Sequence, residues 1–458
     1  MLWQYIKEKM LGHPQKTLSE QEAVLTFEQA VIFAESFGQK LEEECYGILC
    51  KSELSAALAI LSCFAAGKTA VPLALRYGEK HCRRIIEKIR PPYVITDIGG
   101  QLRTVDVDDG SYFCPEDPAL IMCTSGTTGQ PKGVMLSREN ILANLKSVCG
   151  YFRIGKTDRI LITRSLYHCA VLTGELLASL VNGTDVVFFS GGFDPVDIIH
   201  TIKKNGITVC CGTPTVFALI SSYARHLEVR LKSIVLSGEI LSAPDAEKIR
   251  MAFPGTDIYH VYGLTEASPR VTYLSPEDFD KIPGSVGKPV SGVRVTVVCP
   301  DGTPARAGED GEICVSGANV MIGYFRDRER TKKVLTDGIL HTGDTGYMDS
   351  DGYLFVRGRA DDMIIRSGMN IYPAEIENAL RSDPRVRDVA AYGYQRLHSG
   401  TAIGILVQGD FSDRQQVLKL CSSLLPEYEI PSRIDIVETI PRNGFGKIIR
   451  TVPGGDEK

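Results

Sequence analysis

The sequence predicts an α/β protein whose large N-terminal domain contains mostly parallel sheets covered by helices. Short apolar runs alternate with helix-like stretches up to about residue 350, which is the pattern of parallel strands joined by helices. After Pro289 the chain becomes rich in β-type segments separated by Gly/Asp turns, which predicts a small antiparallel, barrel-like unit. The 458 residues also exceed the length of one ordinary domain.

The individual elements follow from local patterns. Helices are predicted over residues 53–67, 138–148 and 194–204. Short apolar runs that end at turn signals predict strands at residues 70–75, 93–96, 120–123, 186–189, 208–211 and 233–236. The β-rich segments are residues 292–298, 311–316 and 352–356.

A rise in charge density near residues 358–362 predicts a domain boundary. We therefore expect a large domain over residues 1–359 and a small α+β domain over residues 360–458. The elements predicted for the small domain are helices at 373–381 and 412–424 and strands at 386–394 and 402–407.

Composition excludes several classes of function. The formal net charge of −5 argues against a general nucleic-acid binder, whose phosphate contacts need a basic surface. The 13 cysteines include no CxxC pair, so a zinc ribbon is not expected and a reducing compartment is favoured. The apolar run from Leu54 to Gly67 is shorter than the roughly 20 residues of a membrane span. The first ten residues lack the apolar stretch of a signal peptide, so we expect a cytoplasmic protein.

A loop dense in hydroxyls and glycines is the strongest local signal. Glycines let backbone N–H groups approach an anion closely, and hydroxyls add further donors. Pro131 stands where a Walker A loop needs glycine before its lysine, so an ordinary P-loop is disfavoured, and a flexible surface loop is the alternative. The residues that we expect to bind phosphate are Thr124, Ser125, Gly126, Thr127, Thr128, Gly129 and Lys132.

This loop resembles the phosphate-binding signature of the adenylate-forming superfamily, which includes acyl- and aryl-CoA synthetases, peptide-synthetase adenylation domains and beetle luciferases. Further segments resemble motifs of that superfamily in the expected order and together cover nearly the whole chain. They are residues 24–27, 61–73, 262–266, 341–344, 358–377 and 441–447.

The resemblance implies that a carboxylate attacks the α-phosphate of ATP and expels pyrophosphate. Two anions must meet in this step, so charge has to be neutralised and aligned. Lys447 resembles the catalytic lysine that bridges the carboxylate and the α-phosphate, although a solvated lysine in the tail is the alternative. Glu266 should hold Mg²⁺, because hard cations take oxygen ligands. Thr265 beside it should bond the α-phosphate.

The nucleoside end of ATP is expected at other residues. Asp344 should accept hydrogen bonds from the ribose hydroxyls with help from Arg359, and a turn-forming aspartate is the alternative. The segments that resemble the adenine-binding part of the superfamily contribute Gly238, Glu239, Tyr262 and Gly263.

The second half-reaction transfers the acyl group to a thiol. Asp361 matches the hinge about which the small domain of this superfamily rotates, a common type of domain motion. Gly368 would line a narrow thiol channel, since a side chain there would block a pantetheine arm. Arg366 departs from the small residue found in many CoA ligases, so CoA and the phosphopantetheine arm of an acyl carrier protein remain open as acceptors.

The residue types in the acid pocket favour a fatty or aryl acid. His168 stands where amino-acid-activating relatives carry an aspartate for the substrate amine, and the alternative is a structural histidine. The leading interpretation is a fatty or aryl acyl-CoA synthetase, acting as a monomer or homodimer, and an acyl-carrier-protein ligase is the close alternative. A catalytically inactive sensor of nucleotides or acyl-adenylates is disfavoured, because the charged residues expected at the site are all present.

Overall fold

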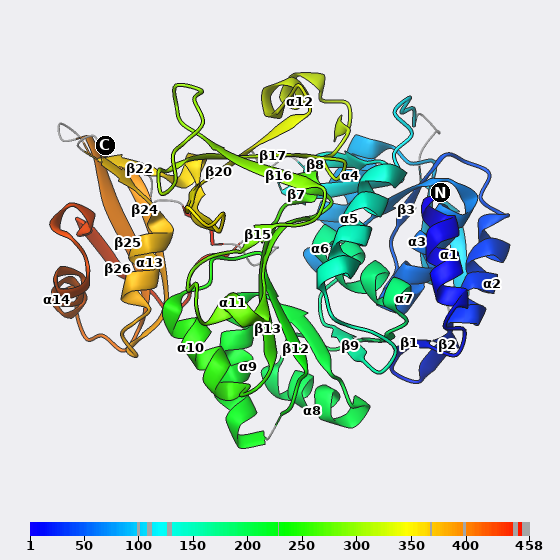
Figure 1. Ribbon diagram of the computed structural model, residues 1–458, viewed down its shortest axis with the longest axis horizontal. Coiled ribbons are helices and arrows are strands. Elements are labelled where there is room, and N and C mark those ends of the chain that lie inside the picture. Colours follow the sequence, from blue (N-terminus) through cyan, green and yellow to red (C-terminus); the bar gives the residue numbers. More distant parts are fainter. Residues whose placement is uncertain are drawn as a thin grey trace.

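Two large mixed sheets form the N-terminal part of the chain in the computed structural model (Figure 1). The structure describes residues 1–98, 101–107, 112–125, 131–227, 229–366, 369–396, 400–442 and 448–450. One sheet has nine strands in the order β15-β14-β13-β12-β11-β9-β10-β1-β2, and the other has seven in the order β18-β8-β7-β4-β3-β5-β6. The central strands of both sheets pair in parallel.

The strands of these two sheets are short, and most are buried. Those of the nine-stranded sheet are β1 (Thr17–Glu20), β2 (Ala23–Thr26), β9 (Arg159–Ile162), β10 (Asp185–Phe188), β11 (Val209–Gly212), β12 (Ser233–Ser237), β13 (Asp257–Gly263), β14 (Arg270–Leu274) and β15 (Lys288–Pro289). Those of the seven-stranded sheet are β3 (Cys45–Ile48), β4 (Thr69–Pro72), β5 (Tyr93–Ile98), β6 (Gln101–Asp106), β7 (Leu120–Ser125), β8 (Pro131–Leu136) and β18 (Gly323–Tyr324).

Helices cover these sheets, and several begin at a capping side chain. Ser52, Ser137 and Asp194 each accept a hydrogen bond from a backbone N–H in the first turn of the helix that follows; such a cap is worth about 1 kcal/mol. The helices of the large sheets are α1 (Leu2–Leu11), α2 (Phe27–Gly38), α3 (Glu53–Ala66), α4 (Glu79–Ile89), α5 (Arg138–Tyr151), α6 (Cys169–Val171), α7 (Ala178–Asn182), α8 (Pro195–Asn205), α9 (Pro214–Leu227), α10 (Ala243–Ala252) and α11 (Pro276–Phe279).

A third, five-stranded sheet follows and is antiparallel throughout. It contains β16 (Val293–Val298), β17 (Gly311–Gly317), β19 (Leu335–Thr336), β20 (Ile339–Met348) and β21 (Leu354–Arg359), with helix α12 (Arg328–Val334) between β18 and β19. Its last strand, β21, leads through a short 3₁₀ turn at Ala360–Asp362 into the C-terminal part of the chain.

The C-terminal elements lie together at one end of the molecule, at the left of Figure 1, and the N-terminal helices lie at the other end. The C-terminal elements have a hydrophobic cluster of their own, which includes Ile376, Ile405 and Val417. The elements are β22 (Ile364–Arg366), β23 (Met369–Ile371), α13 (Pro373–Leu380), β24 (Val386–Arg396), β25 (Gly400–Gly409), α14 (Arg414–Leu424) and β26 (Arg433–Ile436).

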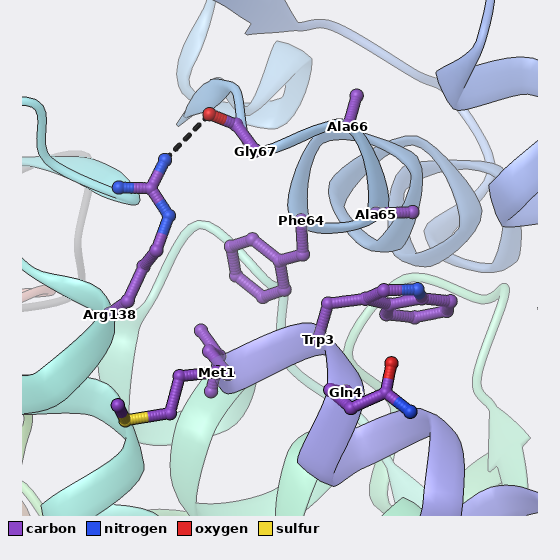
Figure 2. Close-up of a pocket in the computed structure, with 9 residues that line it drawn as sticks. Met1, Trp3, Gln4, Phe64, Ala65, Ala66, Gly67 and Arg138 are labelled. Atoms are coloured by element: carbon purple, nitrogen blue, oxygen red, sulfur yellow. Dashed lines mark hydrogen bonds between the residues drawn. The ribbon is translucent and has the colours of Figure 1, made fainter.

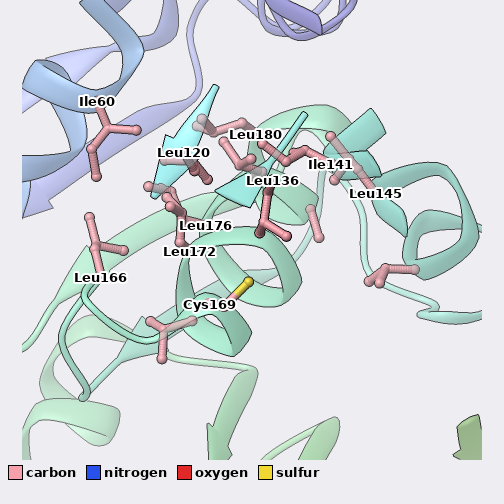
Figure 3. Close-up of a cluster of buried hydrophobic side chains, with 14 of the residues drawn as sticks. Ile60, Leu120, Leu136, Ile141, Leu145, Leu166, Cys169, Leu172, Leu176 and Leu180 are labelled. Carbon is pink, nitrogen blue, oxygen red and sulfur yellow. The ribbon is translucent and has the colours of Figure 1, made fainter. Parts of the chain in front are cut away.

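The core behind the hairpin of β7 and β8 is built from several helices (Figure 3). Leu120 and Leu136 on these strands pack with Ile60 of α3, Ile141 of α5 and Leu176 of a π-helical turn. All five side chains are fully buried, and each contributes about 1.5–3 kcal/mol to stability through burial. This packing fixes the strands that carry the predicted phosphate loop.

The α/β class and the change to an antiparallel unit after Pro289 are confirmed. The predicted helix over residues 53–67 is α3, the predicted strand at 120–123 is β7, and the segment at 311–316 is β17. Among the described residues, no helix combines the length and the apolar character that crossing a membrane would need.

Candidate functional site

Asp344 lies at the centre of one half of the candidate site, where the nine-stranded sheet meets the five-stranded sheet. The hydroxyl of Tyr262, on β13, donates to one carboxylate oxygen at 2.5 Å. The guanidinium of Arg359, on β21, donates to the other at 3.0 Å and to the carbonyl of Thr342 at 2.8 Å. Both oxygens of a largely buried carboxylate therefore have fixed donors, which sets its orientation.

The backbone around Asp344 is held just as firmly. Its N–H donates to the hydroxyl of Thr342 at 3.0 Å, and that hydroxyl donates to the carbonyl of Ile313 at 2.7 Å. Gly343 has φ of +69°, and a Cβ at this position would lie 2.9 Å from the Arg359 guanidinium. A residue with a side chain would therefore be strained and would displace the arginine.

The charges in this half of the site affect one another. Burial lowers the pKa of Arg359, but the carboxylate of Asp344, together with those of Asp361 and Glu266, holds this pKa above its ordinary value. Burial together with Asp344 raises the pKa of Tyr262 well above the ordinary value. Tyr262 is therefore a neutral donor to a charged acceptor, a strong type of hydrogen bond.

Glu266 and Lys132 form the second half of the site. Glu266 lies on the 3₁₀ turn Thr265–Ala267 after β13, and the hydroxyl of Tyr324 donates to its Oε1 at 2.9 Å. The ammonium of Lys132, on β8, lies 5.7 Å from the centroid of the Tyr324 ring. Burial lowers the pKa of Lys132, although the charge of Glu266 opposes this. Tyr324 thus contacts both a cation and a carboxylate, and the cation directly follows the predicted phosphate loop.

His168 belongs to an aromatic cluster that contacts the start of this loop. Its Nε2 lies 2.5 Å from the hydroxyl oxygen of Tyr77. The neighbouring Tyr167 donates its hydroxyl to the carbonyl of Cys123, and His81 lies 3.2 Å from the same hydroxyl. Cys123 directly precedes Thr124, so the structure brings His168 to the base of the predicted phosphate loop.

The remaining predicted residues of the nucleotide site have structural partners as well. Gly263 passes so close to the chain that a Cβ would lie 2.0 Å from the carbonyl oxygen of Pro269, so only glycine fits. Gly238 follows β12. The carboxylate of Glu239 accepts from the backbone N–H and the hydroxyl of Thr215, at 3.2 and 2.7 Å. The side chain of Glu239 therefore anchors the first turn of α9.

Several predictions fall on residues outside the described ranges. Lys447, Gly368, and Gly126, Thr127, Thr128 and Gly129 lie there, as does the side chain of Ser125. Thr124 and Lys132 face each other across the hairpin, and so do the backbones of Ser125 and Pro131, so the predicted loop joins two paired strands. Asp361 is exposed in the turn that follows β21, with its carboxylate 4.0 Å from the Arg359 guanidinium.

A cavity of about 360 Å³ lies elsewhere, between the start of α1 and the end of α3 (Figure 2). Polar and apolar atoms line it in about equal measure, and the guanidinium of Arg138 donates to the carbonyl of Gly67 at 2.6 Å. None of the site residues predicted from the sequence is among the described residues that line this cavity. It is therefore separate from the candidate site.

Two residues of the candidate site were not predicted from the sequence. Tyr324 and Tyr77 contact Glu266 and His168, but they are 58 and 91 residues away from these partners. No spacing rule connects them. The one available signal for Tyr324 was the short Gly-Tyr strand before a charged helix.

Comparison with known proteins identifies the family of this chain. Residues 105–325 match the AMP-binding enzyme family and residues 375–447 match the AMP-binding enzyme C-terminal domain. A 2-succinylbenzoate–CoA ligase of Bacillus licheniformis is 31% identical over 91% of this chain and 90% of its own. A feruloyl-CoA synthase of an Amycolatopsis species is 35% identical over 73% of this chain and 69% of its own.

The fold has solved counterparts. The O-succinylbenzoate coenzyme A synthetase of Bacillus subtilis, in complex with ATP and magnesium ion, superposes with a TM-score of 0.85 at 26% identity, covering 97% of this chain and 98% of that chain. The chain belongs to the AMP-binding enzyme family and is an acid–thiol ligase. Within that class it is similar to proteins named 2-succinylbenzoate–CoA ligase and feruloyl-CoA synthase, and also, at 31% identity over 83% of this chain, to a long-chain-fatty-acid–CoA ligase of Escherichia coli.

Proposed function

We propose that this protein uses ATP to convert a carboxylic acid into an acyl-AMP with release of pyrophosphate, and then transfers the acyl group to CoA. The observation that carries the proposal is the fixed carboxylate of Asp344, held on one side by Tyr262 and on the other by Arg359. Lone pairs on its two oxygens are suited to accept hydrogen bonds from the two hydroxyls of a ribose. Family membership and the solved relative that holds ATP support this assignment.

The phosphates would lie next to Lys132 and Glu266. Tyr324 occupies Oε1 of Glu266, and the other carboxylate oxygen is the kind of hard ligand that Mg²⁺ prefers. These oxygen donors fit Mg²⁺, which when bound would neutralise charge on the phosphate oxygens. Lys132 would contribute a second positive charge, and Thr265 beside Glu266 would donate to the α-phosphate.

Lys447 is proposed as the residue that brings the two anions together. It belongs to the proposed small domain, residues 360–458, which would move relative to residues 1–359 about Asp361. Gly368 would line the path of the thiol. If Lys447 acts in adenylation and Gly368 in thiol transfer, Lys447→Ala should abolish acid-dependent ATP–pyrophosphate exchange and leave thioester formation from pre-made acyl-AMP largely intact. A parallel loss of both activities would contradict it.

We further propose an aryl or fatty acid as substrate and CoA as acceptor. The half-buried His168 packs edge-on against Tyr77 and Tyr167. None of these three side chains carries a carboxylate that would pair with the α-amino group of an amino acid, so an amino acid is disfavoured as substrate. Two of the relatives above are named for aryl acids and for CoA, so CoA is preferred to a carrier protein.

A pyrophosphate-release screen tests the proposal. Purified protein receives ATP and Mg²⁺ with aryl, fatty or amino acids, each in the presence of CoA, of phosphopantetheinylated carrier protein or of neither. We expect release with aryl or fatty acids, and a thioester with CoA. A thioester with carrier protein alone would instead identify the acyl-carrier-protein ligase. Tight binding of nucleotide without release from any acid would identify the inactive sensor.

A further inference from the structure

A cluster of three metal-binding residue types lies on the five-stranded sheet, outside the proposed nucleotide contacts. Glu312 and Cys314 lie two residues apart on β17, on either side of a register shift in its pairing with β20, and His341 of β20 pairs with Cys314. Nδ1 of His341 lies 2.9 Å from Oε2 of Glu312 and 3.6 Å from Sγ of Cys314. Within the described residues this is the one group of three such side chains whose ligand atoms all lie within 4.8 Å of one another.

These separations suit a tetrahedral ion. Zinc takes sulfur at about 2.3 Å and nitrogen or oxygen at about 2.0–2.2 Å, which places tetrahedral sulfur and nitrogen ligands roughly 3.5–3.6 Å apart. The observed sulfur–nitrogen separation of 3.6 Å is already of this size. The nitrogen–oxygen pair at 2.9 Å would have to open to roughly 3.4 Å, which a small rotation of the half-exposed glutamate provides. We propose that Glu312, Cys314 and His341 bind a divalent cation of the zinc class, with water as the fourth ligand.

The surroundings allow an ion to enter. The side chains of Glu312 and His341 are 34% and 36% exposed, whereas Cys314 is buried beneath them. Burial raises the pKa of the Cys314 thiol to about 11, so the thiol is protonated at neutral pH without metal. Binding therefore releases the thiol proton to solvent while the sulfur forms its bond to the ion.

The site differs from the proposed magnesium site in both chemistry and position. A thiolate and an imidazole favour zinc or cobalt over magnesium, whereas Glu266 and phosphate oxygens favour magnesium. The other oxygen of Glu312 accepts from the N–H of Gly343 at 3.1 Å, one residue before Asp344. The ion would thus lie beside the strand that presents Asp344 without using any of the nucleotide contacts.

Cobalt titration of the full-length protein, stripped of metal with a chelator and free of ATP and acid, tests this. We expect one equivalent of Co²⁺ to bind and to give a thiolate-to-cobalt charge-transfer band, which Zn²⁺ then abolishes by displacement. C314S should remove the band. E312Q and H341Q should weaken Co²⁺ binding by roughly 100-fold, because even a change beyond the ligands themselves costs roughly 10–100-fold.

The control is C149S, which removes a free thiol that is half-buried and lies outside the cluster, and this variant should keep the band and the affinity. Circular dichroism of each variant separates a lost ligand from a lost fold, and the two variants that retain Cys314 keep the test valid if C314S is unstable. Absence of a charge-transfer band in the unaltered protein would overturn the proposal, as would a band that survives in C314S. Neither result depends on adenylation, so the proposed function can stand or fall independently.

Discussion

Replacing Tyr262 with phenylalanine removes one of the two donors that hold Asp344. The lost bond joins a neutral hydroxyl to a charged, largely buried carboxylate at 2.5 Å, and such bonds contribute about 1.5–3 kcal/mol. Since each 1.4 kcal/mol is tenfold, the full loss would lower kcat/KM for ATP by about 10- to 150-fold. Arg359 keeps its own contact with the other oxygen, so we expect a value near the low end, roughly tenfold.

The assay is initial-rate ATP–pyrophosphate exchange with ATP varied at saturating acid, and then with acid varied at saturating ATP. The KM for ATP should rise and the KM for acid should not. Tyr273→Phe is the matched control, because it also removes a tyrosine hydroxyl, but from the adjacent strand β14. The ring of Tyr273 stacks on Tyr151, with the ring centroids 4.1 Å apart. An unchanged ATP dependence in Tyr262→Phe, or an equal change in the control, would refute the role assigned to Asp344.

Three other substitutions probe separate parts of the molecule. Tyr77→Phe removes the hydroxyl 2.5 Å from His168 and should raise the KM for acid roughly 2- to 10-fold with the KM for ATP unchanged; an equal rise in both would place His168 away from the acid. Leu136→Ala should lower the free energy of unfolding in urea by about 2–5 kcal/mol, and a loss below 1 kcal/mol would contradict the packing in Figure 3. Burial lowers the pKa of His260, so the unfolded chain takes up a proton that the native state excludes, and stability falls as the pH drops below about 6.5. His260→Gln should flatten this fall by up to about 1.4 kcal/mol per pH unit; an unchanged slope would contradict it.

Elements with a strong local pattern were predictable from the sequence. The run from Leu54 to Gly67 is helical because most of its side chains are apolar and those of residues 57–64 are buried, and Ser52 caps its first turn. The strands at residues 120–123 and 233–236 are short apolar runs bounded by turn residues, and both are buried in sheets. Sheet order was not predictable, because β9 pairs with β11 and β8 pairs with β18 across long stretches of sequence.

The candidate site likewise contains some residues that the sequence could predict and others that it could not. Asp344 and Glu266 stand in recognisable motifs, so their place at the site could be expected. Their partners depend on tertiary placement, as the contact of Tyr324 with Glu266 shows. A register shift separates Glu312 from Cys314 in the pairing of β17 with β20, so the meeting of these residues with His341 could not be read from strand periodicity. The sequence thus identifies residues with distinctive chemistry, and the sheets decide which of them meet.

The fixed part of the candidate site and the proposed hinge lie within a few residues of each other. Arg359 is held at Asp344 by the register of β20 and β21, and the proposed hinge at Asp361 begins two residues later. Across this turn, Arg357 donates to Glu375 of α13 at 2.8 Å, and both side chains are 37% exposed. Exposed pairs of this kind are worth about 0–1 kcal/mol, so breaking this one would be a small obstacle to the proposed rotation, and the backbone at Asp361 would be the more sensitive point.

Asp361→Pro and Arg357→Ala separate these two contributions. Proline restricts backbone rotation, so Asp361→Pro should spare ATP–pyrophosphate exchange and slow thioester formation from acyl-AMP. Arg357→Ala should change both rates by less than roughly fivefold, as expected for a pair worth at most about 1 kcal/mol. Equal losses in both half-reactions for the proline variant would refute a moving hinge. A large, selective effect of Arg357→Ala would instead show that the ion pair controls the rotation.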